Sequence, residues 1–273
     1  MENEMRKFTS ALLAGLLLAG TSAMVSAAET GVGDAPWDLK ARIYFWLPDA
    51  PIDILVNQMN VGNLPESLDS ILEGLQMAFM GEFELVKGPL TFFVSPIYYN
   101  GKVHRDFVDP FGDTRRYSVA EKVWLVDYGV GWAFGPWNLS EGADSATLTL
   151  TPYFGARYFH DPVRLNVPPG ANDPGLSLKN TIAFNTGIAG LRANVKISDK
   201  WSFGIAGDVG VFDANEVKKT WQTVGTVNYH FKIKNTPSVF FVGYRYLVLD
   251  VINPPVEADI VAKGPLLGIG FEW

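Results

Sequence analysis

The sequence predicts an all-β fold: a transmembrane, antiparallel, up-and-down β-barrel that follows an export signal. Three observations predict it. Hydrophobic residues make up 48% of the chain and aromatic residues 13%, yet no stretch after the N-terminal segment reaches the ~18 apolar residues that mark a transmembrane helix. The apolar residues recur in short alternating stretches with turn residues between them, as in barrel strands that face lipid on one side. The final stretch, 264–273, alternates in the same way.

The N-terminal segment is expected to be a cleaved signal peptide covering residues 1–27. Arg6 and Lys7 give it a basic start, and the apolar run that follows is about half the ~20 residues of a membrane-spanning helix. Small residues come next, and cleavage is predicted after Ala27. An uncleaved amphipathic anchor is the alternative. Residues 28–273 are then predicted to form a single exported barrel domain.

Composition excludes several classes of site. The chain contains no cysteine, which excludes disulfides, thiolate metal sites and a lipidated N-terminal cysteine. Its formal net charge of −7 argues against a nucleic-acid partner, for which a basic surface is expected. The sequence has no Gly-x-Ser-x-Gly elbow and no His-Glu-x-x-His zinc motif. No cofactor and no metal are therefore predicted.

Ten stretches alternate clearly enough to be predicted as strands. In the first, Ile43 and Phe45 share one face while Arg42 and Tyr44 share the other. An even number of strands returns both termini of the barrel domain to the same, periplasmic side. Merging two weak strands would give eight, and splitting a long one would give twelve. The predicted strands are 37–48, 76–87, 89–101, 118–135, 146–160, 181–197, 200–212, 219–233, 238–250 and 260–273.

The predicted connections include three long segments rich in Pro, Gly, Asp and Asn. These segments, 49–75, 101–117 and 161–180, are predicted to face the external side. The first contains a predicted short amphipathic helix at 65–75, with Pro65 suited to its first turn and leucine and isoleucine at helical spacing. We expect this helix to pack against the barrel rim. A lid over the lumen is the alternative.

Charged residues stand in mid-strand on the face opposite the apolar one. They favour a membrane barrel with a polar lumen over a soluble barrel or sandwich, whose inward face would be apolar. Six are predicted to form a balanced lumen network, because buried ions need partners and arginine pairs well with carboxylates. The network fills the lumen in our preferred interpretation and lines a narrow pore in the alternative. The six are Glu82, Glu84, Arg157, Arg192, Asp208 and Arg245, and Asp127 is a seventh mid-strand charge outside the predicted network.

The last predicted strand has apolar residues on one face and a terminal aromatic residue. These features resemble the signal that the outer-membrane barrel assembly machinery reads during insertion. The resemblance implies that machinery as a partner, and outer-membrane lipid and lipopolysaccharide as the surroundings of the folded chain. The residues concerned are Leu267, Ile269, Phe271 and Trp273.

Short motifs spread over nearly the whole mature chain carry a second resemblance. They include Tyr44-Phe45-Trp46, Gly81-Glu82-Phe83-Glu84, Gly155-Ala156-Arg157-Tyr158, Gly190-Leu191-Arg192, Gly207-Asp208-Val209-Gly210 and Gly243-Tyr244-Arg245-Tyr246. Together they resemble a large, poorly characterised family of proteobacterial outer-membrane β-barrel proteins. The resemblance implies a porin-like barrel in a Gram-negative outer membrane, and it implies no catalytic residue and no substrate. Val211 departs from the family's glycine-rich pattern.

Three functions compete. A structural or surface-interaction barrel with a filled interior is the leading hypothesis, and a narrow passive channel for small solutes is the second. An outer-rim hydrolase is the third, because His104 with Asp106 and His160 with Asp161 stand where predicted strands meet long loops. Solvated loop histidines are the plainer interpretation, so an enzyme is not expected. A basic group in the second long segment is a candidate for lipopolysaccharide phosphates: Lys102, Arg105, Arg115 and Arg116.

Overall fold

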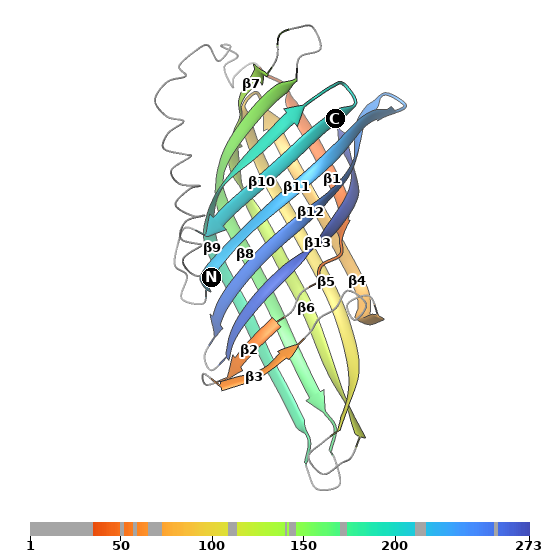
Figure 1. Cartoon of the computed structure of the whole chain (residues 1–273), viewed down its shortest axis with the longest axis vertical. Helices are drawn as coiled ribbons and strands as arrows, with labels where there is room; N and C mark the ends of the chain where they lie inside the picture. The colour runs from red at the N-terminus through yellow and green to blue at the C-terminus, as the bar shows by residue number, and fades with distance from the viewer. Residues whose placement is uncertain are drawn as a thin grey trace.

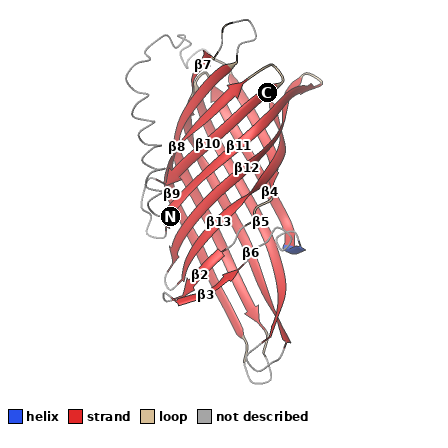
Figure 2. Cartoon of the chain, viewed as in Figure 1, coloured by secondary structure: helices blue, strands red, loops and turns tan. Residues whose placement is uncertain are grey.

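In the computed structural model, ten strands form a closed antiparallel ring in which β13 returns to β1 (Figures 1 and 2). The ten-stranded barrel predicted from the alternation is confirmed. The structure describes residues 35–49, 52–56, 59–64, 73–108, 114–139, 141, 146–169, 174–210, 217–253 and 256–273. In ring order the strands are β1 (Trp37–Trp46), β4 (Leu75–Lys87), β5 (Leu90–Val108), β6 (Thr114–Trp132), β8 (Thr147–Val167), β9 (Leu176–Lys196), β10 (Trp201–Gly210), β11 (Val217–Ile233), β12 (Thr236–Asn253) and β13 (Val256–Glu272).

Two hairpins, β5–β6 and β8–β9, are much longer than predicted. Strand pairing continues through most of 101–117 and 161–180, with Lys102 opposite Ala120 and Arg164 opposite Lys179. The prediction that these segments are loops was therefore wrong. Beyond a lipid layer neither face of a strand has to be apolar, so backbone hydrogen bonds hold the ladder together without an alternating pattern. Both hairpins project from the end of the barrel opposite the C-terminus (Figure 1).

Three short strands extend the barrel wall. The hairpin of β2 (Ile52–Val56) and β3 (Met59–Leu64) lies within the first segment predicted as a loop, and β2 pairs with the start of β13. Near the other end, β7 (Phe134–Asn138) pairs with β8. Most of the predicted helix, 65–72, lies outside the described residues, and Leu75 opens β4 instead of ending a helix.

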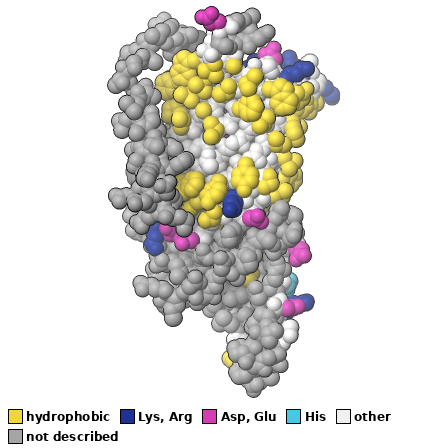
Figure 3. Space-filling view, viewed as in Figure 1, with side chains coloured by type: hydrophobic (Ala, Val, Ile, Leu, Met, Phe, Trp, Pro, Cys, Tyr) yellow, Lys and Arg dark blue, Asp and Glu magenta, His cyan; other side chains and the backbone are white. Residues whose placement is uncertain are grey.

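The outer wall of the barrel carries a band of exposed apolar side chains. Figure 3 shows it on one face, with charged side chains above and below it. The ring centroids of Trp201 on β10 and Tyr229 on β11 lie 5.0 Å apart near one edge of the band. Those of Trp221 on β11 and Tyr246 on β12 lie 5.1 Å apart near the other edge. Tyr229 and Trp221 are ~27 Å apart along a tilted strand, which matches a lipid-facing band ~25 Å tall between aromatic girdles. Other band members are Ile43, Phe45, Phe92, Trp124, Phe154, Ile205, Phe240 and Leu267.

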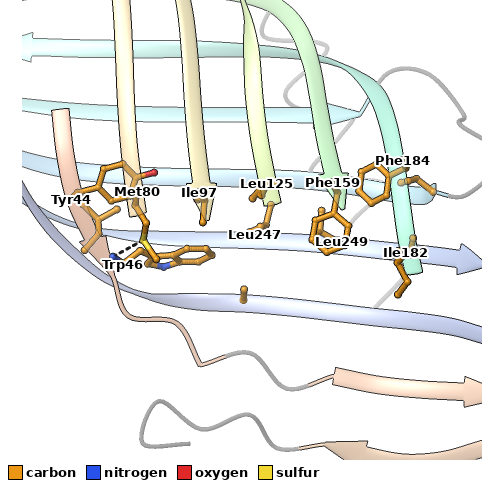
Figure 4. Packing of buried hydrophobic residues seen from close by; sticks show 14 of the residues in the cluster. Tyr44, Trp46, Met80, Ile97, Leu125, Phe159, Ile182, Phe184, Leu247 and Leu249 are labelled. Carbon is orange, nitrogen blue, oxygen red and sulfur yellow. Dashed lines mark hydrogen bonds between the residues drawn. The ribbon is translucent and has the colours of Figure 1, made fainter. Parts of the chain in front are cut away.

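The interior of the barrel half nearer the long hairpins is mainly apolar, with Asp161 the buried acid there among the described residues. Inward-facing Leu125, Phe159, Phe184 and Leu249 belong to one buried cluster that fills the lumen there. Figure 4 shows these side chains pointing into the space between opposing walls, with the Trp46 backbone N–H against the Met80 sulfur. This half of the barrel is therefore mainly apolar on both faces of its wall. Within the described residues no helix is long and apolar enough to cross a membrane.

If the band faces lipid, a charged side chain within it should lower the free energy of unfolding more than a charged side chain outside it. Phe154 is 64% exposed in mid-band on β8, so Phe154→Arg should lower the free energy of unfolding by about 2–4 kcal/mol in lipid vesicles. The measurement is a urea titration followed by heat-modifiable gel mobility. Ser177→Arg, at an exposed site on the projecting part of β9, is the control and should change little. Equal effects of the two variants would contradict a lipid-facing band.

Candidate functional site in the barrel lumen

The centre of the lumen is occupied by the guanidinium of Arg157, which is fully buried. Its Nε and Nη2 donate to the two carboxylate oxygens of Asp127 at 2.8 and 2.9 Å. Nη2 also donates to Asp208 at 2.9 Å, and Nη1 donates to the Thr220 hydroxyl at 2.8 Å. The four residues come from β8, β6, β10 and β11, so one side chain on β8 joins walls on either side of the lumen.

Three further side chains complete this central charged layer. The Tyr153 hydroxyl donates to Asp208 at 2.9 Å, and the Gln222 amide donates to both carboxylates. Arg245, from β12, donates to the Gln222 carbonyl oxygen and to the Tyr44 hydroxyl, and it lies 3.8 Å from Asp127. Two carboxylates therefore face two guanidinium groups inside the barrel, which is the balance that buried ions require.

A second charged group lies between this layer and the end of the barrel where β1 begins and β13 ends, called the terminal end below. Arg192 contacts Glu84 and lies 4.0 Å from Glu82, while Arg42 lies 3.5 Å from Glu82. The Arg192 guanidinium also lies over the rings of Phe93 and Tyr153, at 4.7 and 5.3 Å from their centroids. This group too pairs two arginines with two carboxylates.

Glycines make room for the large side chains of these layers. A Cβ at Gly190 would lie 2.3 Å from the Tyr153 ring, so the ring occupies the space that any other residue would need. Gly129 and Gly155 are opposite one another on β6 and β8, and a Cβ at Gly155 would meet the Tyr128 carbonyl oxygen at 2.0 Å. The close backbone approach beside Arg157 therefore depends on glycine at this pair.

A cavity of about 410 Å³ occupies the lumen between the central layer and the terminal end. Its lining combines the second charged group with neutral polar side chains such as Thr151, Asn194 and Thr226, and it reaches the turn residues Gly88 and Ala133. On its other side the central layer and the apolar cluster fill the barrel. The lumen is thus a polar chamber at one end and a packed core at the other.

The structure places all six residues of the predicted network on inward faces, in two separate groups. Arg157, Asp208 and Arg245 belong to the central layer, and Glu82, Glu84 and Arg192 belong to the second group. The prediction missed Asp127, which holds Arg157 more extensively than Asp208 does, and it missed Arg42, Tyr153 and Gln222. The alternation placed Asp127 on the inward face of its strand. It could not show that Asp127 meets Arg157, because the distances between inward side chains depend on barrel closure and strand register.

The two acids of the hydrolase hypothesis have other surroundings than the predicted ones. Asp106 instead accepts two hydrogen bonds from Arg116, at 2.7 and 3.2 Å, and this guanidinium holds the pKa of that exposed carboxyl below its usual value. His160 stacks on Tyr158 on the outer wall, whereas Asp161 is buried on the inward face. The sequence did not predict the 2.8 Å contact between the Ser202 hydroxyl and His230 Nε2. Ser202 is only 2% exposed, so a substrate has little access to its hydroxyl. The described residues contain no cluster of three or more potential metal ligands.

Comparisons with known proteins find distant structural matches. No protein-family model matches the sequence, and no curated protein matches it. Among solved structures, the chain is similar to the translocator domain of autotransporter NalP from Neisseria meningitidis, with 13% identity, 97% of each chain covered and a TM-score of 0.31. It is also similar to Ail of Yersinia pestis, with 9% identity, 87% and 98% coverage and a TM-score of 0.27. The outer membrane protein OprG from Pseudomonas aeruginosa gives 10% identity, 88% and 96% coverage and a TM-score of 0.26. Because these scores are low, the function proposed below rests on the chain's own geometry.

The central layer predicts a large effect from the loss of one charge. Arg157→Met leaves Asp127 and Asp208 buried without their main partner, so it should lower the free energy of unfolding by about 3–5 kcal/mol. Adding Asp208→Asn alone returns the layer to one carboxylate, Asp127, facing one guanidinium, Arg245, and should restore part of that loss. Arg116→Met, which breaks a solvated ion pair, should have no measurable effect. Urea unfolding in vesicles checks all three, and a mild effect of Arg157→Met alone would contradict the buried layer.

Proposed function

We propose that this protein is a β-barrel of a Gram-negative outer membrane with a sealed lumen and a role at the cell surface. The lipid-facing band supports the membrane location, and ring closure supports it further because β13 pairs with β1, so the ring of ten described strands has no open edge between its first and last strand. Export by the predicted signal peptide and insertion through the C-terminal strand belong to the same proposal. Of the proposed assembly residues, Leu267 and Trp273 are exposed on the outer wall, and Phe271 packs 5.8 Å from Trp273.

The observation that carries the proposal is the double closure of the lumen. The central charged layer spans the barrel through hydrogen bonds of 2.6–2.9 Å around Asp127 and Asp208. Beyond it, buried apolar side chains such as Leu125 and Leu249 fill the remaining length. A hydrated ion could pass only by breaking the hydrogen bonds of the central layer and displacing the apolar side chains beyond it. Barrels of this size have interiors only wide enough for side chains.

The long hairpins support the surface role. The strands of β5–β6 and β8–β9 continue well past Trp124 and Tyr158, the aromatic residues at the edge of the band. Crossing a membrane takes ~9–11 residues per strand, whereas β8 and β9 have 21 residues each. The additional length forms a paired, rigid wall outside the lipid. Such a wall is suited to presenting a surface to other molecules.

Planar-bilayer recording tests the sealed lumen directly. Purified and refolded mature protein should give no steady current steps, while a heat-modifiable band on gels shows that the barrel is folded. Steady, salt-dependent steps that change with Arg192→Gln or Glu82→Gln would contradict the proposal. They would instead support the second candidate, a narrow channel, which the 410 Å³ chamber favours because it already extends from the terminal end to the central layer.

Cysteine labelling tests the orientation of the barrel in the membrane. Because the chain contains no cysteine, an introduced cysteine is the only thiol that can react. Ser177→Cys on the projecting part of β9 should react with a membrane-impermeant maleimide on intact cells. Ser198→Cys, in the short turn between β9 and β10, should react only after the outer membrane is permeabilised. Labelling of Ser198→Cys alone on intact cells would mean that the barrel is inserted the other way, with the hairpins in the periplasm.

A further inference from the structure

The outer wall carries an uneven distribution of charge just beyond the lipid-facing band. Lys102 on β5 is opposite Ala120 on β6, which is opposite Arg164 on β8, which in turn is opposite Lys179 on β9. Directly opposed residues project from the same side of a sheet with Cβ atoms ~5 Å apart. The three basic residues therefore form one row across four neighbouring strands. All three are exposed, and with Lys122 they are called the basic row below.

The basic row begins at the edge of the membrane. Lys122 precedes Trp124 by two residues on the same face of β6, and its Nζ lies 6.0 Å from the ring centroid of Tyr98. Two residues are ~7 Å of strand, so Lys122 stands beside the aromatic edge of the band and the other cations stand further out. Headgroups occupy the ~5–8 Å next to the hydrocarbon on each side of a bilayer. Long basic side chains reach across such a distance.

The cations of the basic row have no carboxylate partner among the residues that the structure describes. No salt bridge joins Lys102, Lys122, Arg164 or Lys179 to an acid there. The nearby acid Asp106 is held by Arg116 in two hydrogen bonds. The opposite wall mixes acidic and basic residues, since Asp250 on β12 is opposite both Asp259 on β13 and Lys219 on β11. Within its described residues, a chain with a net charge of −7 thus gathers positive charge without ion-pair partners on one side.

We propose that the basic row binds the phosphate groups of a glycolipid in the outer leaflet, whose acyl chains lie against the apolar band below it. Lysine and arginine donate charge-assisted hydrogen bonds to phosphate, and arginine does so with two parallel donors. The row rises away from the membrane edge at Lys122, so it suits a lipid with phosphates carried on sugars more than one with a single phosphate at the hydrocarbon boundary. The inference rests on the proposed outer-membrane location.

The test measures lipid binding to the purified, folded barrel in a zwitterionic detergent by native mass spectrometry. The probe is diphosphorylated lipid A, compared with the same lipid after enzymatic removal of its phosphates. The test variant is Lys102→Gln/Arg164→Gln/Lys179→Gln. Its control, Lys200→Gln/Lys232→Gln/Lys234→Gln, removes equal charge from exposed residues at the opposite end of the barrel. Lys102→Arg/Lys179→Arg keeps the charge and serves as a conservative variant.

We expect the test variant to bind diphosphorylated lipid A at least about tenfold more weakly than the native chain, while the control and conservative variants bind normally. The native chain should discriminate against the dephosphorylated lipid by a similar factor, and excess inorganic phosphate should not displace bound lipid. Unchanged binding in the test variant, or equal binding of the dephosphorylated lipid by the native chain, would overturn the inference. A conducting barrel whose lipid binding still depends on the basic row would refute the sealed lumen and leave the inference standing.

Discussion

The fully buried guanidinium of Arg157 sets the strongest constraint on this barrel. An ion in that position without partners costs several kcal/mol, so its donors must meet acceptors supplied by other strands. They meet Asp127, Asp208 and Thr220 on β6, β10 and β11. A slip of one residue in any of these strands would carry its polar side chain to the lipid face. The register of four strands is therefore tied to one hydrogen-bonded group, as well as to the backbone ladder.

The central layer also divides the lumen into two different environments. Toward the terminal end, the second charged group and the neutral polar side chains line an open chamber. Toward the long hairpins, residues such as Phe159 and Leu249 pack as they would in the core of a soluble protein. The barrel wall there is mainly apolar inside and outside, and it gains stability from packing on both faces. In the part of the chain that the structure describes, inward-facing side chains of the barrel strands themselves form this closure.

The sequence predicted the ring well because the alternation reflects lipid on one side of every strand. Ile43 and Phe45 face out and Tyr44 faces in, as their spacing indicated. The prediction failed in the projecting hairpins. Both faces of these strands meet water, so nothing requires apolar and polar residues to alternate along them. The six lumen charges were assigned to the inward face from parity alone. Their division into two groups, and the hydrogen bonds that Asp127 and Gln222 make with them, depend on strand register and barrel closure. Local sequence patterns do not contain that information.

The central claim is that Arg157 is held in a water-excluded layer that closes the barrel. Hydrogen exchange at arginine Nε–H groups, followed by NMR of the folded protein in detergent micelles, measures this most directly. Arg157 donates its Nε–H to Asp127 at 2.8 Å inside the barrel, whereas Arg116 makes its ion pair on the exposed outer end of β6. The account predicts that the Arg157 Nε–H exchanges orders of magnitude more slowly than that of Arg116. Equal exchange rates at the two arginines would show that water reaches the layer and would contradict it.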